Sequence, residues 1–155
     1  MPFNVDKCKV MHIGFNNNLV KYEMSGKFLE VTEERDLGVI IRSDLKCSSQ
    51  CTKAVNTANR VLGMIRRIFC VRDKNIILLL YKAMVRPHLE YSVQACRPHF
   101  RGDIDLLEGV QRRATKLLTS VSNKTYEDRL RDLNLTTLET RRLEGDLIEV
   151  FKIFK

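Results

Sequence analysis

The spacing of apolar residues changes near residue 45, and this change constrains the fold more than any other feature of the chain. Before it, apolar and polar residues alternate in short runs such as residues 7–13, and alternation by two is typical of a β-strand with one buried face. After it, apolar residues recur at intervals of three and four, which is the period of an amphipathic helix. The chain is therefore predicted to be α+β and mostly α, with a small antiparallel β segment at residues 1–45 and a helical bundle at residues 46–155.

The N-terminal segment contains four short runs that predict strands, at residues 7–13, 19–24, 28–31 and 37–41. Turn-forming residues separate them at residues 14–18 and at Ser25-Gly26. We expect these runs to pair as one small antiparallel sheet.

The C-terminal segment predicts a series of helices. The first carries the apolar stripe Ala54, Ala58, Val61, Ile65 and Ile68. Asp73 is predicted to cap a second helix over residues 74–85 that ends before Arg86-Pro87, because a residue that precedes proline avoids the helical region. Further helices are expected at residues 89–95, from the N-cap Asp103 to about residue 119, at residues 126–132, and after the N-cap Thr136.

The last predicted helix has an apolar stripe that is still running where the sequence stops. The stripe consists of Leu143, Leu147, Val150, Phe151 and Phe154, and no Gly or Pro stop signal follows it before Lys155. This pattern predicts that the segment is truncated at its C-terminal end. A truncated N-terminal end is also expected, from a resemblance to a known family.

Positive charge is concentrated in the helical segment. Residues 1–45 hold 6 Lys and Arg against 7 Asp and Glu, whereas residues 46–155 hold 21 against 12, within a formal net charge of +8 for the chain. A basic field of this kind favours polyanionic partners, of which nucleic acid is the commonest, although basic helices can also serve solubility alone.

Membrane insertion, secretion and several catalytic classes are disfavoured by the sequence. The start has no signal-peptide pattern, the longest apolar run is too short to cross a bilayer, and five scattered cysteines do not resemble a disulfide framework. We therefore expect an intracellular protein, in the cytoplasm or nucleus. Neither a nucleophile motif nor a Gly-rich phosphate loop is present.

A zinc site is also disfavoured, although Cys8, His12, Cys47 and Cys51 are suitable ligand types. On a strand, Cys8 and His12 would lie about 13 Å apart, which is too far for two ligands of one metal ion. The acidic pairs of the chain fall at predicted turns or helix starts, where capping explains them, so no catalytic carboxylate and no metal ligand is predicted.

Three arginine pairs, Arg66-Arg67, Arg112-Arg113 and Arg141-Arg142, are predicted to lie on the polar sides of helices. A solvated face with intrahelical ion pairs is one interpretation, and contact with backbone phosphates, for which the arginine fork is well suited, is the other. The residues predicted to bind nucleic acid are Lys53, Arg60, Arg67, Arg112, Arg113 and Lys116.

Five ordered blocks of the sequence resemble the C-terminal part of reverse transcriptases from jockey-like non-LTR retrotransposons (long interspersed elements). The blocks are FNVDKCKVMHIG at 3–14, DLGV at 36–39, LYKAMVRPHLEY at 80–91, LLEGVQRRATKL at 106–117 and LETRRLEGDLI at 138–148. Together they span nearly the whole chain.

The resemblance implies a polymerase fragment that begins after the catalytic Asp-Asp motif. It implies that residues 3–13 are the last strands of the palm, that Asp36, Leu37, Gly38 and Val39 match the primer grip, and that the helices form the thumb. Asp36 departs from the family pattern, which usually has an aromatic residue there, and Cys96-Arg97-Pro98 stands where relatives usually have Trp-Ser-Pro. The parent polymerase would use Mg²⁺, whereas no cofactor is expected in this chain.

Three hypotheses follow. The first is a thumb-like fragment that binds an RNA–DNA or DNA duplex through the phosphate backbone but does not polymerise alone. The second is a non-catalytic protein-interaction module or folded relic, whose exposed apolar face contacts the missing polymerase portion or drives self-association. The third, catalysis by this chain, would need carboxylates from another polypeptide.

Overall fold

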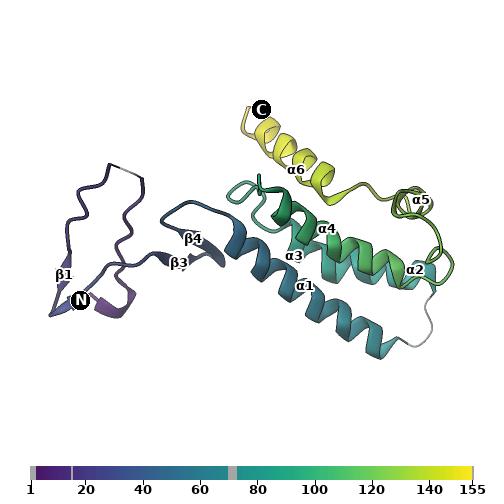
Figure 1. Ribbon diagram of the computed structural model, residues 1–155, viewed down its shortest axis with the longest axis horizontal. Helices are drawn as coiled ribbons and strands as arrows, with labels where there is room; N and C mark the ends of the chain where they lie inside the picture. Colours follow the sequence, from purple (N-terminus) through teal and green to yellow (C-terminus); the bar gives the residue numbers. More distant parts are fainter. Residues whose placement is uncertain (1–2, 15, 70–72, 155) are drawn as a thin grey trace. The chain divides into compact units, whose positions relative to one another are not determined.

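The structure, a computed structural model, describes residues 3–14, 16–69 and 73–154. The chain divides into two compact units, Met1–Gln50 and Cys51–Lys155. Short antiparallel β-hairpins precede a series of helices, so the predicted fold class, α+β and mostly α, is confirmed (Figure 1).

The first unit contains two separate β-hairpins. Strand β1 (Glu23–Met24) pairs with β2 (Lys27–Phe28), and β3 (Glu33–Asp36) pairs with β4 (Val39–Arg42), both antiparallel. Each turn has two residues with positive φ, Ser25 and Gly26 in the first hairpin and Leu37 and Gly38 in the second. Two such residues in succession are the signature of a type I′ turn, whose twist matches that of the flanking strands.

The N-terminal region differs from its prediction in several ways, and one of them is that strand β3 lies at Glu33–Asp36, outside every predicted strand. Residues 7–13 do not form a strand: a short 3-10 helix, η1 (Val5–Lys7), precedes them, and the only pairing in the described part of this stretch is an isolated parallel bridge between Val10 and Glu30. The side chain of Asn4 accepts a 3.1 Å hydrogen bond from the amide of Asp6, which stabilises the tight turn at the expense of extended pairing. The hairpins are two sheets, where one was expected.

The second hairpin is attached to the first residues of α1 (Ser48–Ile68) by side-chain hydrogen bonds. The Ile40 amide donates to Gln50 Oε1 at 3.0 Å, and Ser49 Oγ accepts from Arg42 and donates to Glu33 Oε2, each at 3.2 Å. Gln50 is buried. These contacts fix the strand that follows the turn at Leu37 and Gly38.

The second unit is a helical bundle. Its elements after α1 are α2 (Lys74–Leu80), the π-helical turn η2 (Tyr81–Val85), α3 (Arg86–Glu90), α4 (Arg101–Lys116), α5 (Tyr126–Asp132) and α6 (Leu138–Ile153) (Figure 1). The face of α1 that packs inward carries Cys51, Val55, Ala58, Leu62 and Ile65, and α4 contributes Leu107, Val110 and Ala114 to the same core. Both stripes have the expected spacing of three and four, but the buried face of α1 is rotated from the predicted stripe, since Ala54 and Val61 are half-buried and Ile68 is 63% exposed.

The helical run from residue 74 continues through Pro87, contrary to prediction. Asp73 does cap α2, by accepting from the amides of Asn75 and Ile76. The amide of Arg86 then bonds to the carbonyl of Tyr81, five residues earlier. This wider turn restarts the helix so that Pro87 falls in the first turn of α3, where a missing N–H costs little.

Three further boundaries differ from prediction. Residues 91–95 form turns, so the helix predicted at 89–95 lies earlier in the chain, as α3. Helix α4 begins after Phe100, whose carbonyl accepts from the amides of Asp103 and Ile104, and Asp103 therefore lies in the first turn instead of at the N-cap. Thr137, not Thr136, caps α6 by accepting from the amide of Thr140. The predicted helix at 126–132 is confirmed as α5.

Candidate nucleic-acid interface

A basic groove lies between α1 and α4. It is lined by Asn59, Leu62, Gly63 and Arg66 from α1 and by Arg113, Lys116 and the adjoining Leu117 at the end of α4, and its volume is about 390 Å³. Of the described residues that line the groove, three are cationic and none is acidic. We call this surface the α1–α4 groove.

The cations of the α1–α4 groove are largely available for an external anion. Arg66, Arg113 and Lys116 are exposed, and none of them forms an ion pair with a residue in the described part of the chain. The guanidinium of Arg113 donates a 3.0 Å hydrogen bond to Asn59 Oδ1, which joins the two helices across the groove. An amide oxygen is a neutral acceptor, so Arg113 is oriented while its charge remains uncompensated.

The predicted residues of α1 form a ridge beside the groove. Positions 53, 60 and 67 are seven residues apart and therefore lie on one helix face, next to the face of Asn59, Gly63 and Arg66. Arg60 and Arg67 are exposed, and Arg67 Nε donates to the carbonyl of Gly63 at 3.4 Å. Lys53 is half-buried.

The predicted pair Arg112-Arg113 diverges, because consecutive residues on a helix point about 100° apart. Arg113 lines the α1–α4 groove. Arg112 instead extends towards Tyr126 of α5, with its guanidinium carbon 5.1 Å from the ring centroid. The guanidinium of Arg129 lies 5.6 Å from the same ring. Arg112 is exposed but held by this cation–π contact.

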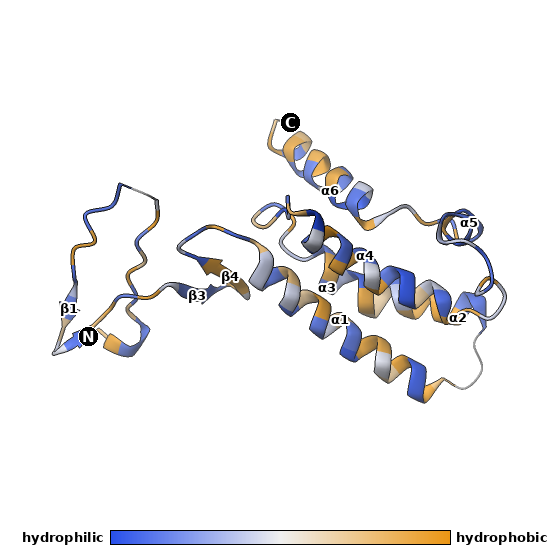
Figure 2. Cartoon of the chain, in the orientation of Figure 1, coloured by the Kyte–Doolittle hydropathy of each residue, from blue (hydrophilic) through white to orange (hydrophobic). Residues whose placement is uncertain are grey.

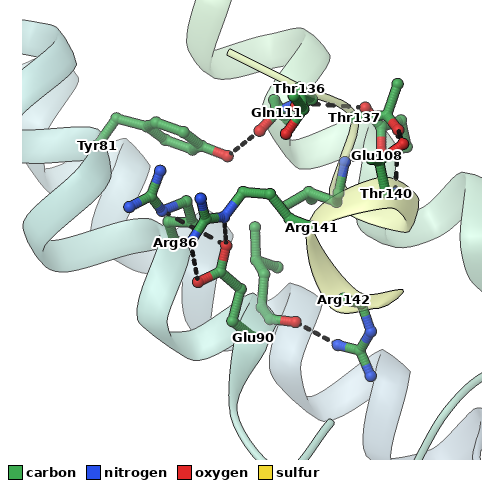
Figure 3. Close-up of polar contacts among 12 residues, drawn as sticks. Tyr81, Arg86, Glu90, Glu108, Gln111, Thr136, Thr137, Thr140, Arg141 and Arg142 are labelled. Atoms are coloured by element: carbon green, nitrogen blue, oxygen red, sulfur yellow. Dashed lines mark hydrogen bonds and ion pairs between the residues drawn. The ribbon is translucent and has the colours of Figure 1, made fainter. Parts of the chain in front are cut away.

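A buried polar cluster determines the position of α4, and Figure 3 shows part of it. Gln111, which is fully buried, accepts a 2.6 Å hydrogen bond from Tyr81 Oη and donates to the carbonyl of Thr136 at 2.9 Å and to Tyr126 Oη at 3.0 Å. Glu108 accepts from Tyr126 Oη and from the amide of Leu138. Contacts from two residues of α4 thus reach η2, α5 and the start of α6.

The environment of the two tyrosines favours their neutral form. Burial raises the pKa of Tyr81, and burial followed by the hydrogen bond to Glu108 raises the pKa of Tyr126. Both hydroxyls therefore stay protonated at neutral pH and can donate the hydrogen bonds that orient Gln111 and Glu108.

The third predicted arginine pair, Arg141-Arg142, does not lie on a solvated face. Arg142 is buried, and its guanidinium donates to the carbonyl of Leu89 at the end of α3 (Figure 3) and, at 2.6 Å, to the carbonyl of Cys96. Arg141 donates to the carboxylate of Glu90, and this hydrogen bond is the main cause that raises its pKa. The pair therefore attaches α6 to α3. The spacing of charges in the sequence could not distinguish a structural arginine pair of this kind from a solvent-exposed pair.

Asp36, Leu37, Gly38 and Val39, the predicted primer-grip-like residues, form the β3–β4 turn. Asp36 and Val39 pair at the ends of the two strands, and the side chain of Leu37 is 86% exposed at the tip.

The cysteines and histidine that were considered for zinc have other contacts. Cys8 Sγ donates to the carbonyl of Asn4 at 3.4 Å, and His12 Nδ1 lies 3.1 Å from Asn17 Oδ1. Cys51 is buried beside Cys96, and a hydrogen bond between the two thiols is the main cause that lowers the pKa of Cys51. Across residues 3–14, 16–69 and 73–154, no three His, Cys, Asp or Glu side chains gather in a way that could hold a metal ion.

Sequence reasoning missed Arg66 and Asn59 as residues of this surface. Arg66 is the neighbour of Arg67 in a pair that the sequence singled out, but only the packing of α1 against α4 decides which of the two faces the groove. In the described residues, no helix is long and apolar enough to cross a membrane. Comparisons of the chain with protein-family models, with curated proteins and with solved structures found no match.

Proposed function

We propose that the helical unit binds the phosphate backbone of an RNA–DNA or DNA duplex, as the thumb-like part of a reverse transcriptase similar to those of non-LTR retrotransposons. The observation that carries the proposal is the α1–α4 groove, where Arg66, Arg113 and Lys116 converge without an acidic neighbour in its described lining. A site of this composition attracts anions, and the guanidinium fork suits phosphate oxygens.

The ridge of Arg60, Arg67 and Lys53 extends the same basic surface along α1. Cations at intervals of about two helical turns can contact phosphates along a duplex without reading its bases. The proposed binding is therefore independent of sequence. In this proposal the chain does not polymerise alone, and the metal-binding carboxylates belong to another part of the polymerase.

Fluorescence polarisation of the full chain with a labelled RNA–DNA hybrid, over a series of salt concentrations, tests the proposal. The three cations of the groove alone should produce a slope of log K against log salt of about −3, because each phosphate contact releases counterions, and contacts from the ridge should make the slope steeper. Replacing Arg113 or Lys116 with Gln should make the slope shallower by about one unit each and weaken binding equally on unrelated sequences.

The matched control is Arg131→Gln on α5. Arg131 is also an exposed arginine of the helical unit, but its guanidinium pairs with Asp128 at 3.5 Å and it does not line the α1–α4 groove. This variant should bind like the parent chain. Equal losses in the Arg113→Gln and Arg131→Gln variants would show that overall charge, not the groove, governs binding, and the proposal would then fail.

A further inference from the structure

Gly63 lies in the middle of the α1 wall of the α1–α4 groove. Asn59 lies four residues before it and Arg66 three residues after it, so the three residues share one helix face. Hydrophilic and apolar bands alternate along α1 and α4 (Figure 2), and the groove lies where cations of the two helices meet. Gly63 therefore leaves a bare stretch of helix backbone between two polar side chains.

Neither helix packing nor backbone conformation requires a glycine at position 63. A Cβ atom built on Gly63 would meet no other part of the described chain within 4 Å, apart from the adjoining residues of α1 itself. Its φ is also not positive, so an alanine would fit the backbone. Because glycine inside a helix is less stable than alanine, the bare backbone destabilises α1 without a compensating contact in the fold.

The space at Gly63 is open, unlike the space at Gly109 of α4. A Cβ atom built on Gly109 would lie 3.5 Å from the guanidinium of Arg113, so a side chain of the same helix fills that position. The space at Gly63 belongs to the groove that Arg113 and Lys116 also line. A glycine allows a ligand to approach the backbone closely, and in a cationic groove that ligand is an anion.

We infer that one strand of the bound nucleic acid lies inside the α1–α4 groove, with its sugar–phosphate backbone against the bare helix at Gly63. Arg66 contacts phosphates of this strand from α1, and Arg113 and Lys116 contact them from α4. The groove volume of about 390 Å³ lies within the range of small-molecule sites, roughly 300–1,000 Å³, which leaves room for a sugar–phosphate unit. The inference rests on the proposed function, because it specifies how the proposed duplex contacts the helical unit.

Larger side chains at position 63 test this arrangement in the full chain. Gly63→Ala should raise the Tm by a few degrees, because alanine favours the helix, and should nevertheless weaken binding to a labelled RNA–DNA hybrid. Gly63→Leu should weaken binding further, by about tenfold at about 0.1 M salt, which is the effect of losing one phosphate contact. The hybrid has 5′-hydroxyl ends, so that only internal phosphates are present, and fluorescence polarisation measures the affinity.

The matched control is Gly145 of α6. Gly145 is half-buried like Gly63 and has open space at its Cβ position, but it does not line the α1–α4 groove. Gly145→Ala should raise the Tm in the same way as Gly63→Ala, and both Gly145→Ala and Gly145→Leu should bind like the parent chain. Equal losses of affinity in the Gly63 and Gly145 variants would overturn the inference. If Gly63→Leu lowers the Tm, the comparison of the two alanine variants decides.

The same assay distinguishes a failure of this inference from a failure of the proposed function. If Arg113→Gln weakens salt-dependent binding but Gly63→Ala and Gly63→Leu do not, the nucleic acid crosses the rim of the groove without entering it, and only the inference fails. If the parent chain shows no salt-dependent binding to the hybrid, the proposed function fails and the inference fails with it.

Discussion

The hydroxyl of Tyr81 donates a 2.6 Å hydrogen bond to Gln111 Oε1, and this bond joins residues 30 positions apart inside the helical bundle. The same amide group of Gln111 donates to the Thr136 carbonyl and to Tyr126 Oη. A buried glutamine with all of its polar atoms paired makes the position of α4 specific in a way that an apolar side chain does not.

Gln111→Met should lower the free energy of unfolding by about 2–5 kcal/mol, because it leaves Tyr81 Oη and the Thr136 carbonyl buried without this partner. Urea denaturation followed by circular dichroism measures the change. Tyr81→Phe should cost less than Gln111→Met, since it removes one hydrogen bond and leaves the others in place. A smaller loss for Gln111→Met than for Tyr81→Phe would contradict the role assigned to the cluster.

Arg142→Met should destabilise the bundle by about 3 kcal/mol, because the carbonyls of Leu89 and Cys96 would lose a charged donor in a buried setting. Differential scanning calorimetry should report the loss as a lower Tm. The matched control is Arg131→Met, whose exposed pair with Asp128 contributes at most a few tenths of a kcal/mol. Similar melting temperatures for the two variants would show that the hydrogen bonds of Arg142 do not stabilise the bundle.

Alkaline pH should destabilise the parent chain more steeply than Tyr81→Phe. Burial holds the pKa of folded Tyr81 above its ordinary value of 10.0, so its stabilising contribution is complete below about pH 10 and is lost as the pH rises beyond the pKa of the unfolded chain. The slope of unfolding free energy against pH above that point should differ by about 1.4 kcal/mol per pH unit between the two proteins. Parallel slopes would contradict the buried environment of Tyr81.

Leu37→Asn should stabilise the β3–β4 hairpin by about 0.5–1 kcal/mol. Leu37 has a φ of +46° at a type I′ turn, where asparagine is preferred and a leucine side chain is strained. Hydrogen–deuterium exchange at the amides of Glu34 and Ile41, which face each other as a hydrogen-bonded pair of the ladder, should slow in the variant. Val39→Asn, which substitutes the neighbouring strand position, should not slow exchange.

Within the proposed function, Arg112→Gln should weaken duplex binding less than Arg113→Gln. The guanidinium of Arg112 lies by the ring of Tyr126, whereas that of Arg113 lies in the α1–α4 groove. The polarisation assay described above makes the comparison at a single salt concentration. An equal or larger loss for Arg112→Gln would move the binding surface towards α5.

Local sequence signals account for much of the fold. Apolar spacing predicts α1 and α4, and the side chain of Asp73 caps α2 as expected, because amphipathic period and capping depend on residues within a few positions of one another. The Ser25-Gly26 turn follows from local preference in the same way. The π-helical turn at Tyr81–Val85 was not predictable, because it depends on how Tyr81 and Val85 pack in the core.

For the candidate sites, the sequence by itself determined that cations gather on helices and that α6 has an apolar stripe. Tertiary structure alone decided which of those side chains meet: Arg66 joins Arg113 and Lys116 in one groove, Arg142 is buried against two carbonyls, and Leu147 faces outward. The reason is that helical period defines the faces of a helix, whereas the contacts between helices far apart in the chain determine which face is covered.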